Sequence, residues 1–369
     1  MYYRLKLYLK NFDWIIFSAV LLLACFGLME VYSVALGLGN NDLLNFYKQV
    51  AFVFGGIILM FFFAFFDHHF LKSLNRYLYW FGALALISVL IFGQTINGTK
   101  GWFSIFGFGI QPVEIIKIIL IIFLAAYFSN LATKVKTAKH FIISAISTVI
   151  LAALIILQPD FGSALVLLAV WLIMVIMAGF NKKYFIVIGI ISILLSGVAW
   201  FSFKDYQKQR ITTFLNPSFE ECSKKECYNS FQAIIAVGSG GLIGKGVGFG
   251  SQSQLKFLPE AQTDFIFSVI AEEMGFLGVM LVLIFFGILF FRSIISLKKI
   301  NNDFGIYFIL GLNGLIFTHM FINIGMNIGL LPIVGIPLPF ISYGGSSILS
   351  LFMGVGIMQN IIIKSKINY

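Results

Sequence analysis

Charged residues are scarce in this chain. Asp, Glu, Lys and Arg make up only 11% of its 369 residues, whereas a typical water-soluble domain carries about 25%. A cytosolic globular enzyme is therefore excluded. Three Cys and seven Pro are too few for a disulfide scaffold or a proline-rich disordered chain. Apolar residues dominate instead, because 60% of the chain is hydrophobic and 43 residues are Phe. With a mean hydropathy of +0.98, the sequence predicts an integral membrane protein.

Apolar runs long enough to cross a bilayer recur along the whole chain. A spanning helix needs about 20 such residues, and we expect spans at 14–34, 46–66, 77–94, 112–130, 140–158, 162–180, 184–203, 265–291, 304–330 and 340–363. The predicted fold is all-α. It is a single polytopic membrane domain over residues 1–369, with about ten transmembrane helices and a long outer loop, 204–264, between spans seven and eight.

The distribution of Lys and Arg predicts the orientation. The outside connections 35–45, 159–161 and 331–339 contain no Lys or Arg, whereas every inside segment is basic if the N-terminus is cytoplasmic. The positive-inside rule and the even span count therefore place both termini in the cytoplasm. The net charge of +10 is spread over these segments, so it indicates membrane orientation and no nucleic-acid partner. No cleavable signal peptide is expected, because the first span is long enough to remain as the targeting helix.

Two predicted outer loops, 95–111 and 204–264, are longer than the other connections, and long loops are usually functional or disordered. The second loop contains the glycine-rich run 238–250 with Lys245. This run is not a nucleotide-binding P-loop, because its spacing differs and Gly246 follows the lysine. Two interpretations stay open. The backbone of the run could approach a diphosphate closely, or the run could form a re-entrant turn.

Charged side chains at membrane depth cost at least about 2.5 kcal/mol each on insertion scales, so each needs a partner or a purpose. Glu114 and Lys117 are three residues apart and can pair on one helix face. They could form a structural ion pair or belong to a functional site. Asp160 follows one apolar run and precedes another, so it could either cap the next helix or serve a site.

The end of the long loop carries further carboxylates. Asp264 lies one residue before the eighth span, and the loop before it is rich in cations that would suit an anionic substrate. It could act as a base or cap the helix. Glu272 and Glu273 lie about two turns into that span. Because adjacent residues point to different helix faces, we expect one of them to pair inside the bundle.

Cysteine and histidine suggest no metal centre. Cys222 and Cys227 frame a short outer segment, where a local disulfide could form in an oxidising compartment. The four His, at 68, 69, 140 and 319, show no metal-ligand spacing with Cys or carboxylates. We expect no structural zinc.

Taken together, these motifs resemble the SEDS family (shape, elongation, division and sporulation) of bacterial cell-wall glycosyltransferases along nearly the whole chain. The matching segments are Gln111-Pro112 to Glu114 with Lys117, QPDFG at 158–162, YQKQR at 206–210 with FLNP at 214–217, GSGG at 238–241, LPE at 258–260 with Thr263-Asp264-Phe265, NIGMN at 323–327, and PLPFISYGGS at 337–346. Within the family, QSQL at 252–255 is more similar to the RodA branch than to the FtsW branch.

The resemblance implies polymerisation of lipid II into glycan strands on the outer face of the cytoplasmic membrane, here in cell elongation and maintenance of rod shape. It implies Asp264 as the essential carboxylate and a class B penicillin-binding protein, the transpeptidase that crosslinks the strands, as the partner. Arg210, Lys117 and Lys245, in that order, are candidates for binding the diphosphate. Glu114 and Asp160 are further substrate-binding candidates. No cofactor is assigned with certainty, and a divalent cation could bridge the diphosphate.

The chain departs from the family pattern in places that leave Asp264 untouched. Gly101-Trp102, preceded by Lys100, stands where the family has Arg-Trp, and His319 replaces a usual Gln. The insert between Cys222 and Cys227 is not a family element. Two alternative functions remain: a lipid II flippase, favoured by the proline-broken segment 330–339, and a non-catalytic scaffold for a cell-wall synthase.

Overall fold

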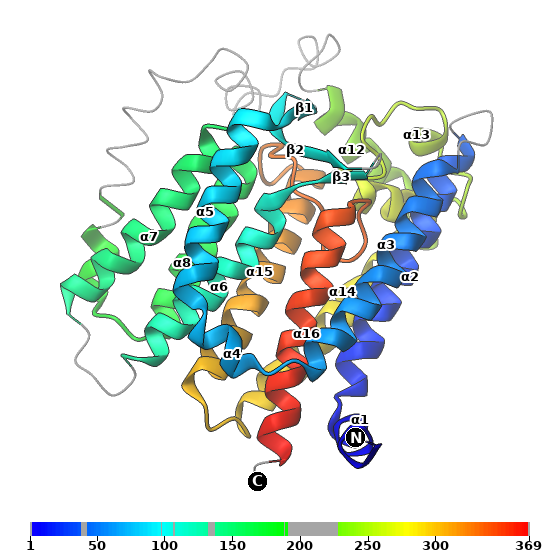
Figure 1. Ribbon diagram of the computed structural model, residues 1–369. Helices are drawn as coiled ribbons and strands as arrows, with labels where there is room; N and C mark the ends of the chain where they lie inside the picture. The colour runs from blue at the N-terminus through cyan, green and yellow to red at the C-terminus, as the bar shows by residue number, and fades with distance from the viewer. Residues whose placement is uncertain are drawn as a thin grey trace.

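In the computed structural model, the apolar runs form a bundle of long helices (Figure 1). The structure describes residues 2–37, 43–96, 98–105, 108–131, 137–187, 189–190 and 228–367. Within them, eight helices are long and apolar enough to span a membrane. They are α2 (Trp14–Gly37), α3 (Leu44–Phe65), α5 (Asn75–Phe92), α6 (Pro112–Ser129), α7 (Ala138–Ile156), α14 (Ile266–Leu297), α15 (Asp303–Asn327) and α16 (Gly345–Ile367).

A shorter apolar helix, α8 (Phe161–Met177), fills the place of the predicted span 162–180. The all-α polytopic fold is confirmed, and nine of the predicted spans coincide with helices α2, α3, α5, α6, α7, α8, α14, α15 and α16. Most of the predicted span 184–203 and the loop residues 204–227 lie outside the described residues. The full span count and the beginning of the long loop therefore stay predictions.

Short elements mark the two ends of the bundle. Helices α1 (Tyr2–Asn11) and α4 (His68–Ser73) lie at the end that also holds the end of α16, and we call this end the termini face (Figure 1). The opposite end, the sheet face, carries strands β1 (Gln94–Ile96), β2 (Thr99–Ile105) and β3 (Phe108–Ile110) together with helices α12 (Tyr228–Ser239) and α13 (Ser251–Gln254). The first and last described helices, α1 and α16, therefore both end at the termini face.

The strands were not predicted. They form an antiparallel sheet in the order β1-β2-β3, in which Thr95 pairs with Lys100 and Ser104 with Gly109. Gly98, between the first two strands, has a φ of +80°, a conformation that glycine adopts at little cost. The predicted outer loop 95–111 is therefore an ordered hairpin structure over its described residues.

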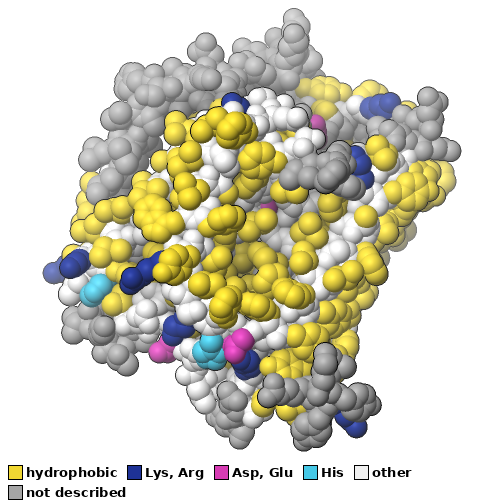
Figure 2. Space-filling view, viewed as in Figure 1, with side chains coloured by type: hydrophobic (Ala, Val, Ile, Leu, Met, Phe, Trp, Pro, Cys, Tyr) yellow, Lys and Arg dark blue, Asp and Glu magenta, His cyan; other side chains and the backbone are white. Residues whose placement is uncertain are grey.

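Helices α6 and α16 occupy the centre of the bundle. In their most apolar windows 72% and 83% of residues are buried, against 28% for α3, α5 and α14. Helix α16 packs closely on α3, because a methyl group added at Gly356 would lie 2.5 Å from the carbonyl oxygen of Met60. Small residues allow such close approach between membrane helices. The peripheral helices instead expose large apolar side chains, such as Phe62 and Trp80, and Figure 2 shows this apolar surface in yellow.

Candidate functional site

Residues 334–338 lie in the connection between α15 and α16 and have no regular secondary structure. Proline at 337 and glycine at 335 keep this stretch from forming a helix. Its backbone carbonyls therefore face neighbouring helices and accept hydrogen bonds from side chains. The residues predicted from the sequence can be located relative to this segment.

Asp264 lies beside it. Asn323 and Asn327, one turn apart on α15, both donate through Nδ2 to the Asp264 carbonyl oxygen, at 2.9 and 3.0 Å. Asn323 also donates to the carbonyl of Ile336 at 2.7 Å, so it ties Asp264 to the segment. A methyl group added at Gly335 would lie 3.4 Å from Asp264 Oδ2. The Asp264 side chain is half-buried, on a backbone that is held from two sides.

Asp264 lies one residue before the N-cap of α14. Helix α14 has Phe265, and not Asp264, at its N-cap position. The backbone N–H groups of Asp264 and Phe265 donate to the carbonyl of Glu260, at 3.1 and 3.3 Å. A turn at 260–265 therefore leads into the helix.

Glu114 and Lys117 form a buried ion pair. Lys117 Nζ lies 2.7 Å from Glu114 Oε1, and both side chains are almost fully buried. Lys117 Nζ is also 3.2 Å from His319 Nε2, and the other ring nitrogen of His319 lies 3.3 Å from the carbonyl of Pro337. His319 stands one helical turn before Asn323, so α15 connects the ion pair and Asp264 to neighbouring points of the same segment.

Asp160 is the N-cap of α8. Its Oδ1 accepts a hydrogen bond from the Ser163 N–H at 2.9 Å, so the capping interpretation is confirmed. Its Oδ2 accepts from Gln111 Nε2 at 3.2 Å, which joins it to the start of α6. A methyl group added at Gly162 would lie 3.0 Å from the carbonyl oxygen of Val334. The beginning of α8 therefore packs on the same segment.

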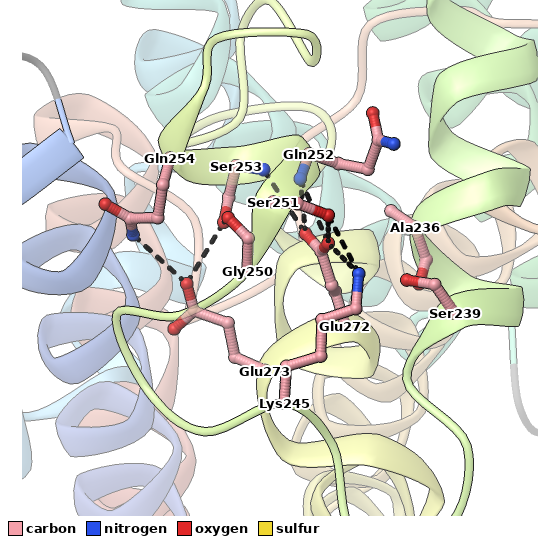
Figure 3. Close-up of polar contacts among 10 residues, drawn as sticks. All are labelled: Ala236, Ser239, Lys245, Gly250, Ser251, Gln252, Ser253, Gln254, Glu272 and Glu273. Atoms are coloured by element: carbon pink, nitrogen blue, oxygen red, sulfur yellow. Dashed lines mark hydrogen bonds and ion pairs between the residues drawn. The ribbon is translucent and has the colours of Figure 1, made fainter.

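Lys245 lies in a different group of residues, shown in Figure 3. Its Nζ is 2.8 Å from Glu272 Oε1, and the Glu272 side chain is fully buried. Glu272 also accepts from Ser251 Oγ at 3.1 Å and from the backbone N–H groups of Gln252 and Ser253, at 3.0 and 3.2 Å. The charge of Lys245 is therefore balanced by a carboxylate of the protein itself.

Glu273 is buried as well. The sequence predicted a partner for one of the two adjacent carboxylates, but both have partners. Glu273 accepts from Ser33 Oγ at 2.6 Å, the Gly248 N–H at 2.9 Å, Ser253 Oγ at 3.1 Å and Gln254 Nε2 at 3.3 Å. The sequence-based expectation was incomplete because the segment 245–254 folds over α14 and supplies donors to both helix faces (Figure 3).

The glycine run 238–250 follows the backbone of α14. Helix α14 is broken at Gly275, which has a φ of +66°. The run supplies the backbone partners that the break requires, because Phe276 N–H donates to the Gly241 carbonyl at 2.9 Å and Lys245 N–H to the Glu272 carbonyl at 3.0 Å. A side chain at Gly244 would overlap the Glu273 carbonyl. Close packing against α14 accounts for these glycines within the structure. It tests neither the diphosphate contact nor the re-entrant turn, so both stay predictions.

Other predicted residues cannot be placed. Arg210, Cys222 and Cys227 lie outside the described residues. Two features were not predicted. Glu30 on α2 is fully buried, interacts electrostatically with Glu273, and has no hydrogen-bond partner for either oxygen among the described residues. The contact of His319 with Lys117 is the second feature. The sequence signal available for Glu30 was a single Glu within an uninterrupted apolar run.

One group of potential metal ligands lies on the termini face. Ligand atoms of Asp67, His68 and His69 are within 4.8 Å of one another, which the sequence analysis did not predict. These atoms already have partners, since Asp67 pairs with Lys364 and His69, and His68 Nδ1 lies 2.8 Å from Asn360 Oδ1. The group is at the opposite end of the bundle from the sheet face (Figure 1).

The chain is similar to known proteins along nearly its whole length. The model of the FtsW/RodA/SpoVE family of cell cycle proteins matches residues 13–367. The chain is 34% identical over 378 residues to the probable peptidoglycan glycosyltransferase FtsW of Bacillus subtilis, covering 97% of this chain and 92% of that protein. It is 28% identical over 425 residues to the peptidoglycan glycosyltransferase RodA of Treponema pallidum, covering 95% and 98%.

A solved structure has the same fold. It belongs to a peptidoglycan synthase complex that coordinates polymerization and crosslinking, and it matches with a TM-score of 0.81 and 27% identity, over 96% of this chain and 98% of that one. This chain therefore belongs to the FtsW/RodA/SpoVE family, the SEDS family, and is a multi-pass membrane protein.

Proposed function

We propose that this protein is a peptidoglycan glycosyltransferase that polymerises lipid II into glycan strands on the outer face of the bacterial cytoplasmic membrane, with both termini in the cytoplasm. The single observation that carries the proposal is Asp264, a half-buried carboxylate on a backbone fixed by Asn323 and Asn327, beside the segment 334–338. The names of the similar FtsW and RodA proteins support the activity.

In the proposed reaction, the 4-hydroxyl of an acceptor GlcNAc attacks the anomeric carbon of a lipid-linked MurNAc. The new glycosidic bond forms as the bond to the diphosphate breaks, so the anomeric centre is inverted. Asp264 takes the hydroxyl proton, and undecaprenyl diphosphate leaves with the bonding electrons. One base suffices, because a diphosphate leaves without protonation by a second carboxylic acid.

Asp264 must gain basicity for this role, since an exposed Asp with a pKa of about 3.9 is a weak base. Its half-buried position next to Gly335 supports partial loss of water around the carboxylate. The fixed carbonyl supports a second contribution, in which a carboxylate of constant orientation aligns the attacking hydroxyl. General-base assistance of this kind contributes about 10²- to 10⁴-fold to a rate.

Arg210 is our first candidate for binding the diphosphate, because a guanidinium can donate two parallel hydrogen bonds to phosphate. Lys117 and Lys245 rank below it, since their charges are balanced by Glu114 and Glu272. Glu114 and Asp160 would then contribute to substrate binding indirectly, because they fix the first turns of α6 and α8. Measuring lipid II binding and turnover of Arg210→Ala tests this ranking, and wild-type values for both would refute it.

We further propose a role in cell elongation, with a class B penicillin-binding protein as the partner. The segment Gln252–Leu255, which resembles the RodA branch, supports the first point. The similar structure of a synthase complex supports the second. Both FtsW and RodA proteins are among the similar proteins, so complementation of depleted cells decides between elongation and division.

One assay separates the proposed activity from its alternatives. Purified protein is incubated with labelled lipid II in detergent, with and without the partner, and the products are sized. A polymerase makes long glycan strands, whereas a flippase or a scaffold leaves lipid II unchanged. Absence of glycan in both conditions, from protein that is folded and monodisperse, would overturn the proposal.

A further inference from the structure

The termini face carries a pocket that the proposed reaction does not use. Its volume is about 180 Å³, and its walls come from α4, the turn between α14 and α15, and the last turns of α16. The polar side chains that matter for its chemistry are His68, His69, Lys299, Asn302 and Lys364. Because it lies at the end of the bundle opposite the sheet face, it is separate from the candidate active site.

The charged groups of the pocket are predominantly positive. Lys299 and Lys364 both line it. Asp67 pairs with Lys364 through Oδ2, and its Oδ1 lies 2.9 Å from His69 Nδ1. One carboxylate therefore fixes the positions of two basic side chains in the pocket wall. Lys299 makes no ion pair within the part of the chain that the structure describes. Its charge is therefore available to a ligand.

The floor of the pocket is rigid and polar. His68 is almost fully buried, with Nδ1 at 2.8 Å from Asn360 Oδ1 and Nε2 at 3.3 Å from Asn302 Nδ2. Its ring lies parallel to that of Phe304, at a centroid distance of 6.0 Å. A ring fixed on both nitrogens cannot turn to coordinate a cation without losing these bonds. The neighbouring ammonium of Lys364 further disfavours a metal ion.

Exposed aromatic side chains lie on the end of α3 and on α4, the helix that also contributes His68 and His69 to the pocket. Phe62 and Phe65 at the end of α3 and Phe70 on α4 are exposed, and Phe66 lies between them with ring contacts of 5.9 Å to Phe62 and 5.6 Å to Phe70. Figure 2 shows histidine and charged side chains gathered at the lower edge of the apolar surface. A ligand with a charged head and a long hydrocarbon tail matches both surfaces at once.

We propose that this pocket binds the phosphate headgroup of an anionic phospholipid from the leaflet at the termini face. Basic pockets between membrane helices commonly bind such headgroups, because each Lys or Arg near the surface contributes about 1 kcal/mol. The lipid tail lies along Phe62, Phe65 and Phe70. This inference is independent of the proposed glycosyltransferase activity, since it uses neither Asp264 nor the sheet face.

Native mass spectrometry of the purified full-length protein tests the proposal. The protein is titrated in detergent with phosphatidylglycerol, with phosphatidylcholine and with inorganic phosphate, and bound species are counted. We expect a saturable phosphatidylglycerol adduct whose affinity falls about fivefold in Lys299→Gln. The matched control is Lys298→Gln, which removes the adjacent lysine outside the pocket lining and should leave affinity unchanged.

Lys299→Gln removes a side chain without an ion pair, so its folding should match that of the control. Equal phosphatidylglycerol affinity in wild type and Lys299→Gln would overturn the proposal. Inorganic phosphate that binds as tightly as the lipid would overturn the lipid assignment, because the tail would then contribute nothing. A Mn²⁺ adduct that His69→Ala removes, without a lipid adduct, would also overturn it.

Discussion

Two regions near the sheet face use carboxylates in different ways. Glu272 and Glu273 are fully buried and surrounded by donors from the segment 245–254. At Asp264, in contrast, Asn323 and Asn327 hold the backbone carbonyl, and the side chain keeps part of its surface exposed. The difference teaches that a carboxylate saturated with buried donors holds a fold together, whereas a half-buried one on a fixed backbone suits chemistry.

The largest effect on stability should come from the saturated region. Glu272→Ala leaves Lys245 without its carboxylate and several donors without an acceptor, so we expect the free energy of unfolding to fall by about 3–5 kcal/mol. Ser251→Ala removes one donor to Glu272 and one acceptor of Lys245 but keeps the ion pair, so it should cost about 0.5–1.5 kcal/mol. Thermal unfolding in detergent measures both. Similar small losses for the two variants would show that Glu272 does not organise this region.

On the termini face, both ring nitrogens of His68 have hydrogen-bond partners. These partners fit only the neutral form of the ring. Burial lowers the pKa of His68 from 6.5 to about 4, with smaller opposing effects from Asn360 and Asp67 and a lowering effect of His69 and Lys364. Between these values the unfolded chain binds a proton that the folded chain does not, so stability falls as the pH falls.

We therefore expect the free energy of unfolding to drop by up to about 3 kcal/mol between pH 6.5 and pH 4 on account of this group. Unfolding measured across that range checks it, with His68→Gln as the control. The wild type should lose more stability than His68→Gln over this range. Parallel curves for the two proteins would contradict the assignment.

Gly335 tests the half-buried region without touching Asp264 itself. Its φ is +76°, and a methyl group there would lie 3.4 Å from Asp264 Oδ2. Gly335→Ala should cost about 1–2 kcal/mol of stability and also lower glycan synthesis. Gly98→Ala is the matched control, because Gly98 has a φ of +80° and open space around it. Equal activity in the two variants would argue against a site at Gly335.

Glu30 is the opposite of a saturated carboxylate, since neither oxygen has a partner among the described residues. Glu30→Met replaces it by an apolar side chain of similar length, and we expect the free energy of unfolding to rise by about 1–3 kcal/mol. Glu30→Gln keeps a polar group at the same place and should gain less. A loss of stability in Glu30→Met would indicate that Glu30 has a partner or a ligand.

The sequence predicted the membrane helices well because length and apolar composition decide them. The run 112–130 corresponds to Pro112–Ser129 and the run 14–34 to Trp14–Gly37. The strands at 94–110 were missed, although the Asn97-Gly98 dipeptide is a recognised hairpin signal. The break at Gly275 could not be predicted, because it depends on partners supplied by residues 241–246, far away in the sequence.

The candidate site was only partly predictable. Asp264, Glu114 with Lys117, and Asp160 were selected by the cost of charge at depth and by the family motifs. Asp264 lies beside the segment 334–338, whereas Lys117 reaches it through His319 and the start of α8 reaches it through Gly162. Their convergence follows from tertiary packing around α15, which no local pattern encodes. For the same reason the sequence could not predict the ion pair of Lys245 with Glu272, which lies 27 residues away in the chain.

The most direct test of the central claim is single-turnover glycan synthesis from labelled lipid II by purified wild type, Asp264→Asn and Asp303→Asn. Asp303, an exposed residue in the first turn of α15, provides a matched change away from the site. We expect Asp303→Asn to equal wild type and Asp264→Asn to bind lipid II but polymerise it at least about 100-fold more slowly. Polymerisation by Asp264→Asn at the wild-type rate would contradict the account.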